Sequence, residues 1–128
     1  MQKLYRTRNF RMGAVAAVLY LGLASSALAH ARLVTSSPTA NSTVAFAPTE
    51  LRLKFSEGVE ISFSKLKLTG PLMIVIETGP ARLAADDNSL VIVPVPALLN
   101  VGKYTVDWQA VSSDGHRTSG GFVFELAK

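Results

Sequence analysis

The sequence predicts an all-β fold after residue 29, a β-sandwich of about seven short strands. Apolar and polar residues alternate with a period of two in the best-defined segments. Turn-forming residues separate these segments, and no stretch has a helical period long enough to compete. Since successive side chains of a strand point to opposite faces, each alternating segment can bury one face and leave the other in water.

The strongest strand signals are three segments with clear alternation. In residues 51–55, leucine and phenylalanine alternate with arginine and lysine. Residues 104–110 and 122–126 repeat the pattern with aromatic and aliphatic side chains. We expect Trp108, in residues 104–110, to belong to the core.

Four other segments predict strands with weaker patterns. Residues 33–35 open the domain, and residues 72–76 and 90–93 are mainly apolar. The alternation in residues 61–68 changes parity, which indicates a bulge or a bend. Turns are expected where backbone-restricting residues gather, at Gly70-Pro71, Gly79-Pro80, residues 86–88, Pro94, Pro96 and residues 100–102.

Residues 1–29 have the three parts of a secretory signal peptide. Four basic residues precede an apolar run over residues 12–24, and Ala27-Leu28-Ala29 has the small-x-small pattern of a cleavage site. A membrane anchor is the alternative, but the apolar run is shorter than the ~20 residues that a spanning helix needs. We therefore expect cleavage after Ala29 and export of a chain that begins at His30.

Charge and composition limit the function of the exported part. Four of the 13 Lys and Arg residues lie in residues 1–29, while all nine Asp and Glu residues lie after them. Residues 30–128 are therefore formally neutral, which argues against a nucleic-acid partner. Their length suits one domain. Without cysteine, a metal must be held by nitrogen and oxygen donors or by Met73, the one methionine after residue 29.

The two histidines, His30 and His116, are candidate metal ligands. A histidine at the first position can chelate a metal through its α-amine and its ring Nδ1. The pKa of the amine is near 8 and that of imidazole near 6.5, so a metal displaces both protons readily at neutral pH. In a chain that keeps residues 1–29 the nitrogen of His30 is an amide, and one donor is missing.

The second histidine follows an Asp-Gly pair in the loop Ser112-Ser113-Asp114-Gly115-His116. Asp114 and His116 can face the same side, and two nitrogens from His30, one from His116 and an oxygen from Asp114 form a tetragonal set that suits Cu(II). The alternative is an ordinary hairpin turn with an exposed histidine. The residues alone leave both interpretations open.

Catalytic motifs are weaker. Ser112 or Ser113 could join His116 and Asp114 in a triad, but no independent acid orients the histidine and no nucleophile elbow is present. Gly120-Gly121 is typical of a strand entry rather than of a phosphate loop. We therefore expect no enzyme activity.

The chain from His30 onward resembles the copper-resistance protein C (CopC) family of bacterial periplasmic copper-binding proteins. The segments that carry the resemblance are His30-Ala31-Arg32-Leu33, Ser37-Pro38, residues 53–57, residues 104–116, Gly120 and Phe122.

This resemblance implies a seven-stranded Greek-key, immunoglobulin-like β-sandwich or barrel, and one Cu(II) ion bound by His30, Asp114 and His116. Glu57 falls in a segment that lies near the copper in relatives, so it is a candidate outer-sphere partner of the amine or of His116. Some family members add a Cu(I) site in a methionine-rich loop. With Met73 alone, this chain lacks that site.

The expected function is a monomeric periplasmic copper carrier or buffer in copper resistance or homeostasis, with an inner-membrane copper transport protein as a candidate partner. Two rival functions are an oxidative copper enzyme of the histidine-brace type and a metal-free immunoglobulin-like interaction module. Asp114 argues against the first, because an anionic donor stabilises Cu(II) and resists its reduction.

Overall fold

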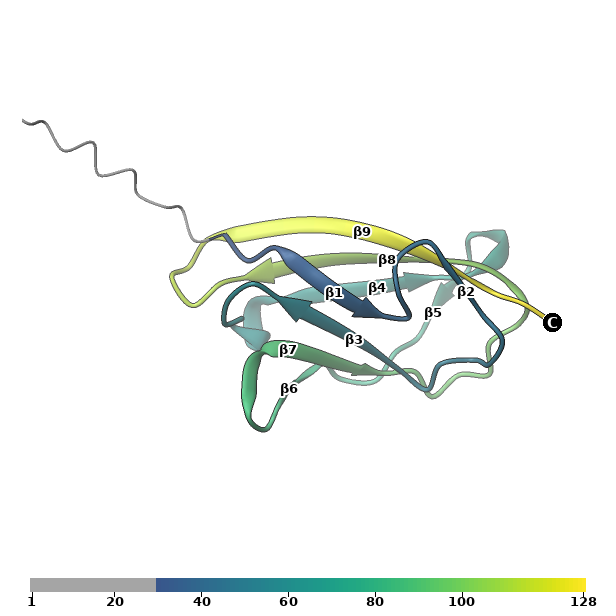
Figure 1. The fold of residues 1–128 in the computed structure, drawn as a ribbon, viewed down its shortest axis with the longest axis horizontal. Helices are drawn as coiled ribbons and strands as arrows, with labels where there is room; N and C mark the ends of the chain where they lie inside the picture. Colours follow the sequence, from purple (N-terminus) through teal and green to yellow (C-terminus); the bar gives the residue numbers. More distant parts are fainter. Residues whose placement is uncertain (1–29) are drawn as a thin grey trace, which may run out of the picture.

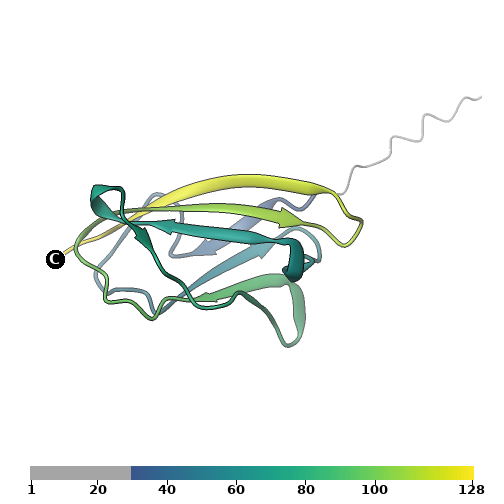
Figure 2. The same ribbon diagram turned by 180° about the vertical axis from the view of Figure 1, so that it is seen from behind.

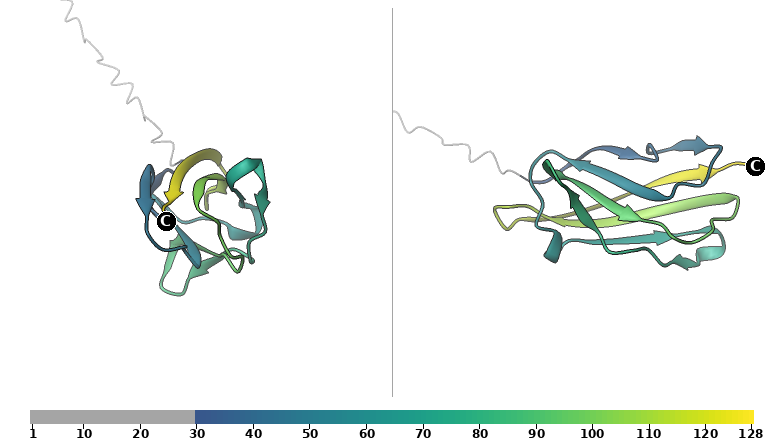
Figure 3. Two further views of the ribbon diagram at one scale, coloured as in Figure 1. Left: turned by 90° about the vertical axis from the view of Figure 1, so that its right-hand side faces the viewer. Right: turned by 90° about the horizontal axis from the view of Figure 1, so that it is seen from below.

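Residues 30–128, the part of the chain that the computed structural model describes, form two β-sheets packed face to face (Figures 1 and 3). The predicted all-β class is confirmed. The expected signal peptide lies outside the described residues. Over the described residues, no helix has the length and apolar character needed to cross a membrane.

The smaller sheet has four strands in the order β1-β3-β7-β6. Its three neighbouring pairs are antiparallel. Leu51, Leu53 and Phe55 of β3 are buried while Arg52 is exposed, as the alternation predicts. The strands are β1 (Leu33–Ser37), β3 (Glu50–Phe55), β6 (Arg82–Ala84) and β7 (Asp87–Pro94).

The larger sheet has five strands in the order β2-β9-β8-β4-β5. The short strand β2 pairs in parallel with β9, and the other pairs are antiparallel. Figure 2 shows this sheet from the side of β4, with a short helical turn at each end of that strand. The strands are β2 (Ser42–Val44), β4 (Lys65–Thr69), β5 (Val75–Ile76), β8 (Gly102–Val111) and β9 (Arg117–Leu126).

Aromatic side chains of the larger sheet pack in the core between the two sheets. The rings of Tyr104 and Phe124 stack with centroids 5.2 Å apart. The Tyr104 hydroxyl donates to the Asn100 carbonyl at 2.6 Å, and burial raises the pKa of Tyr104. Trp108 is partly buried and packs against the core, with its ring plane at 76° to that of Phe55. Its core position, expected from the sequence, is confirmed.

The number of strands differs from the prediction. Residues 30–128 contain nine strands rather than about seven. The additional strands are β2 and β6, which have three residues each and are too short for alternation to be visible. Ile61–Phe63 and Pro71–Met73 are 3-10 turns rather than strand. The parity change in residues 61–68 therefore marks the boundary of a turn and a strand, not a bulge.

Strands β8 and β9 form a hairpin in which ten residues of each strand are paired, the longest pairing between the described strands. Their register runs from Gly102 opposite Leu126 to Val111 opposite Arg117. Gly120 lies opposite Trp108, and a Cβ atom there would be 2.6 Å from the Trp108 ring. The register leaves residues 112–116 as the hairpin loop at one end of the sandwich (Figure 1).

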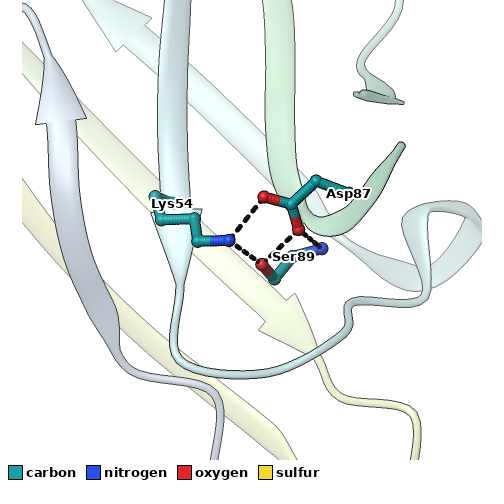
Figure 4. A network of polar contacts seen from close by, with 3 residues as sticks. All are labelled: Lys54, Asp87 and Ser89. Atoms are coloured by element: carbon teal, nitrogen blue, oxygen red, sulfur yellow. Dashed lines mark hydrogen bonds and ion pairs between the residues drawn. The ribbon is translucent and has the colours of Figure 1, made fainter. Parts of the chain in front are cut away.

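A polar network joins the end of β3 to the start of β7. The Lys54 ammonium donates to the Asp87 carboxylate and to the Ser89 hydroxyl (Figure 4). Ser89 also donates to Asp87 through its backbone N–H at 2.9 Å and its hydroxyl at 2.6 Å. Hydrogen bonds from Lys54 and then from Ser89 lower the pKa of Asp87 to about 2.

Replacing Asp87→Asn should destabilise the domain at neutral pH but not at strongly acidic pH. The pKa of Asp87 is lower in the folded state than its ordinary 3.8, so its stabilisation is complete above the ordinary value and is lost as the pH falls toward 2. Urea unfolding of both proteins between pH 7 and pH 2 measures the difference. Lys54→Gln should remove the same pH-dependent part, and a constant difference over this range would contradict the assignment.

Candidate metal centre

The loop between β8 and β9 is held by its own backbone. The Ser112 N–H donates to the His116 carbonyl at 2.9 Å, and the Gly115 N–H donates to the Ser112 carbonyl at 2.8 Å. Gly115 has a φ of +87°, which residues with a Cβ atom adopt at a cost. A tight turn therefore brings Asp114 and His116 together, where the sequence allowed either an extended segment or a bend.

Asp114 accepts three hydrogen bonds within this loop. Its Oδ1 accepts from the buried Ser112 hydroxyl and, at 3.1 Å, from the His116 N–H. Its Oδ2 lies 2.9 Å from His116 Nδ1. These contacts, that of the Ser112 hydroxyl first, lower the pKa of Asp114 to about 2, so the carboxylate is ionised at neutral pH.

The contact with Asp114 fixes which nitrogen of His116 is available. Because Nδ1 faces the carboxylate, Nε2 is the ring nitrogen left for a further partner. His116 is exposed, so that nitrogen is not shut away in the core.

The segment that carries His30 is anchored on two sides. The Thr118 hydroxyl of β9 donates to the Ala31 carbonyl at 2.7 Å. On the other side Arg32 and Ser56 exchange two hydrogen bonds, from the Arg32 N–H to the Ser56 hydroxyl at 2.9 Å and from the Ser56 N–H to the Arg32 carbonyl at 2.8 Å. Ala31 itself is fully buried. The start of the described chain is therefore fixed against the end of the sandwich that carries the β8–β9 loop (Figure 1).

This anchoring places His30 beside His116. The centroids of the two imidazole rings are 5.1 Å apart, with the ring planes at 89°. The Nδ1 atom of His30 is buried and has no hydrogen-bond partner among the described residues. A buried polar nitrogen without a partner has a desolvation cost that a bound ion would remove.

Glu57 lies on the segment between these two parts of the site. Its neighbour Ser56 donates to the His30 carbonyl at 3.3 Å, and its other neighbour Gly58 accepts from the Ser113 N–H at 3.1 Å. The Oε1 atom of Glu57 is buried without a partner among residues 30–128. A second buried polar atom without a partner is therefore present on the segment that bridges His30 and the loop.

The three predicted ligands thus lie close together, but they do not form a finished metal cluster. Over residues 30–128, no group of three or more His, Cys, Asp or Glu side chains is arranged to hold a metal ion. One feature that works against such a group is the contact of the Asp114 carboxylate with His116 Nδ1, which directs both side chains toward each other. Metal binding by these residues stays a prediction.

Sequence reasoning considered Ser112 only as a nucleophile and missed its contact with Asp114. Ser112 is fully buried, and its hydroxyl is the contact that lowers the pKa of Asp114 most. The local signal present is the Asp114-x-His116 spacing, because an aspartate side chain commonly accepts from the backbone N–H two residues on, as Asp114 does from His116. Met73, in contrast, is exposed in the 3-10 turn that follows β4.

Comparisons with known proteins agree on one family. The model of the CopC domain matches residues 33–127, a range that begins after His30. The chain is 46% identical to Protein YobA of Escherichia coli strain K12, over 79% of this chain and 82% of that protein. It is 40% identical to Copper resistance protein C of Escherichia coli, over 84% of this chain and 90% of that protein.

Two further matches add structure and context. The crystal structure of PcoC, described as a methionine-rich copper resistance protein from Escherichia coli, is 36% identical with a TM-score of 0.70, and the match covers 77% of this chain and 100% of PcoC. Copper transport protein CutJ of Bacillus subtilis strain 168 is 32% identical over 83% of this chain, but the match covers only 20% of CutJ.

The positive φ of Gly115 predicts a graded response to substitution. Gly115→Ala should destabilise the domain by about 1 kcal/mol, because a Cβ atom is unfavourable in the left-handed region. Gly115→Asn should cost less, since asparagine tolerates this region. No atom lies within 4 Å of the added Cβ, so steric clash does not contribute. Urea unfolding of the three proteins tests this, and equal stability of the alanine and glycine forms would contradict it.

Proposed function

We propose a function from one established premise: this chain belongs to the CopC family. Two of the reported relatives are named Copper resistance protein C and Copper transport protein CutJ, and neither is named as an enzyme. The proposed function is that of a periplasmic protein that binds one Cu(II) ion, after removal of residues 1–29, and carries or buffers it in copper resistance or homeostasis.

The observation that carries this proposal is the pairing of His30 with His116. The centroids of the two rings, which are far apart in the sequence, lie 5.1 Å from each other, and His30 Nδ1 is buried without a hydrogen-bond partner among the described residues. A hairpin turn with an incidental histidine would give no reason for the first residue of the predicted mature chain to be anchored beside it.

The proposed donor set is completed by cleavage. Removal of Ala29 converts the amide nitrogen of His30 into an amine, which chelates together with Nδ1. Nε2 of His116 supplies the third nitrogen, and the ionised Asp114 supplies an oxygen. For Asp114 to bind the same ion, its carboxylate must first leave His116 Nδ1, because an oxygen hydrogen-bonded there lies on the opposite side of the ring from Nε2. Three nitrogens and one carboxylate oxygen suit the tetragonal preference of Cu(II).

Glu57 is proposed as an outer-sphere partner of this centre. Its Oε1 atom is buried without a partner and lies on the segment that contacts both His30 and Ser113. After cleavage the new ammonium or amine would give this carboxylate a hydrogen-bond donor.

Donor hardness supports Cu(II) over Cu(I). The PcoC structure is described as methionine-rich, whereas this chain has Met73 as its one methionine after residue 29. Met73 lies just after the Thr69 end of β4. The opposite end of this strand, at Lys65, pairs with Gln109 and is the end nearer to the candidate site. A single remote thioether is insufficient for a soft Cu(I) site.

The proposed delivery partner is a copper transport protein of the inner membrane. CutJ, named as a copper transport protein, contains a segment similar to this chain within a much longer polypeptide. A domain that is part of a copper transport protein in one organism can act, in another organism, as a separate protein that binds a copper transport protein.

Replacing His116→Ala in the mature protein should abolish stoichiometric tetragonal Cu(II) binding. The change removes one of three nitrogens and the partner of the Asp114 carboxylate. Electron paramagnetic resonance of the apoprotein titrated with Cu(II) measures this. The mature wild-type protein should give one Cu(II) signal per chain, and failure of this protein to give any signal would refute the proposal.

A chain that keeps Ala29 before His30 provides the matched control. It has every side chain of the mature protein, but its nitrogen at His30 is an amide. Its Cu(II) binding should be much weaker and its spectrum different. Equal binding by the two chains would show that the amine is not a ligand.

A further inference from the structure

We propose that the apolar segment formed by residues 72–76 is a dimerisation surface, through which the protein pairs with a second copy of itself. The resemblance to the family led us to expect a monomer, so this inference goes beyond the proposed function. It does not rest on copper binding, because the segment lies at the end of the sandwich opposite the β8–β9 loop (Figure 1).

The apolar segment is a run of five apolar residues that the fold leaves mostly in solvent. Leu72 and Met73 are 91% and 84% exposed, and the next two residues are more than half exposed. Ile76 is the member that packs against the core. Leu72 and Met73 both have a φ of 60°, in the left-handed region that residues with a Cβ atom adopt at a cost. A strained backbone therefore holds two large apolar side chains away from the core.

The same segment contains an edge strand without polar protection. Strand β5 (Val75–Ile76) pairs with β4 at the border of the larger sheet, so over residues 30–128 its other side has no strand partner. The three other sheet edges, β1, β2 and β6, carry serine, threonine or arginine side chains. An edge strand that lacks charged residues is prone to pair with another chain. Strand β5 thus presents backbone hydrogen-bonding groups next to exposed apolar side chains.

The exposed apolar area is sufficient for a dimer. Pro71 lies against Gly102, since a Cβ atom at Gly102 would be 2.5 Å from the Pro71 ring, and the exposed Val101 is therefore next to the segment. Val101 and residues 72–75 expose roughly 600 Å² in each copy, so that two copies would bury about 1,200 Å², the lower limit of specific dimer interfaces. Soluble monomers rarely expose a larger apolar patch.

A second copy fits this surface better than a charged partner does. None of residues 71–76 is charged, so the surface has no group that would recognise a lipid headgroup, a nucleic acid or a charged peptide. Antiparallel pairing of β5 with its own copy about a two-fold axis would extend the larger sheet and bring the two Val75 side chains close together. Two residues form only a short ladder, so the apolar side chains would supply most of the contact.

The test is sedimentation velocity of the mature protein without copper over a range of concentrations, with Val75→Lys and Val34→Lys as variants. Val34 provides the matched control, because it is 59% exposed where Val75 is 61%, and it lies on the polar edge strand β1. The wild type and Val34→Lys should dimerise. Val75→Lys should weaken the dimer about 100-fold or more, since two ammonium groups would meet across the axis.

A charge-swap experiment separates lost pairing from lost folding. Val75→Glu alone should also be monomeric, and an equimolar mixture of Val75→Lys and Val75→Glu should form mixed dimers, because opposite charges then face each other. Equal weakening by the two lysine variants, or no recovery in the mixture, would overturn the inference. A wild type that stays monomeric would also overturn it, and its binding to phosphatidylcholine vesicles would assign the surface to a membrane instead. None of these results affects the Cu(II) test of the proposed function.

Discussion

The antiparallel pairing of β8 with β9 is the constraint on which the rest of the structure depends. Its ten-residue register fixes Tyr104 against Phe124 in the core, and it continues without a break to the pair Val111 and Arg117. The loop that begins at Ser112 therefore leaves a rigid ladder rather than a flexible strand end. Because a sheet register allows no gradual slip, burial of the aromatic side chains also determines where the loop side chains lie.

A second constraint comes from the start of the domain. Hydrogen bonds from Thr118 and Ser56 hold the backbone beside His30, although the sequence separation to Thr118 is large. Closure of such a long loop has an entropic cost, which the burial of Ala31 and the pairing of β1 with β3 offset. Preorganisation of this kind fits the proposal that an ion binds at His30 after cleavage, since this segment would not need to be ordered again on binding.

Much of the fold could be predicted from the sequence, because three of the strands that form the core, β3, β8 and β9, alternate over five or more residues. Strands β2 and β6 were missed since three residues show no period, and the turn at Ile61–Phe63 appeared only as a change of parity. At the site, residue type and position pointed to His30, Asp114 and His116. The burial of Ser112 and the unpaired Oε1 of Glu57 could not be predicted, because they depend on the packing of residues 56–59 against the loop.

The central claim is that copper is held by two imidazoles and one amine that exists only after cleavage. Electron–nuclear double resonance of the Cu(II)-loaded mature protein, prepared with and without ¹⁵N in its histidine rings, tests this most directly. The account predicts three directly bound nitrogens, of which two change with ring labelling and one does not. A centre in which every bound nitrogen belongs to an imidazole, or in which only one imidazole is bound, would contradict it.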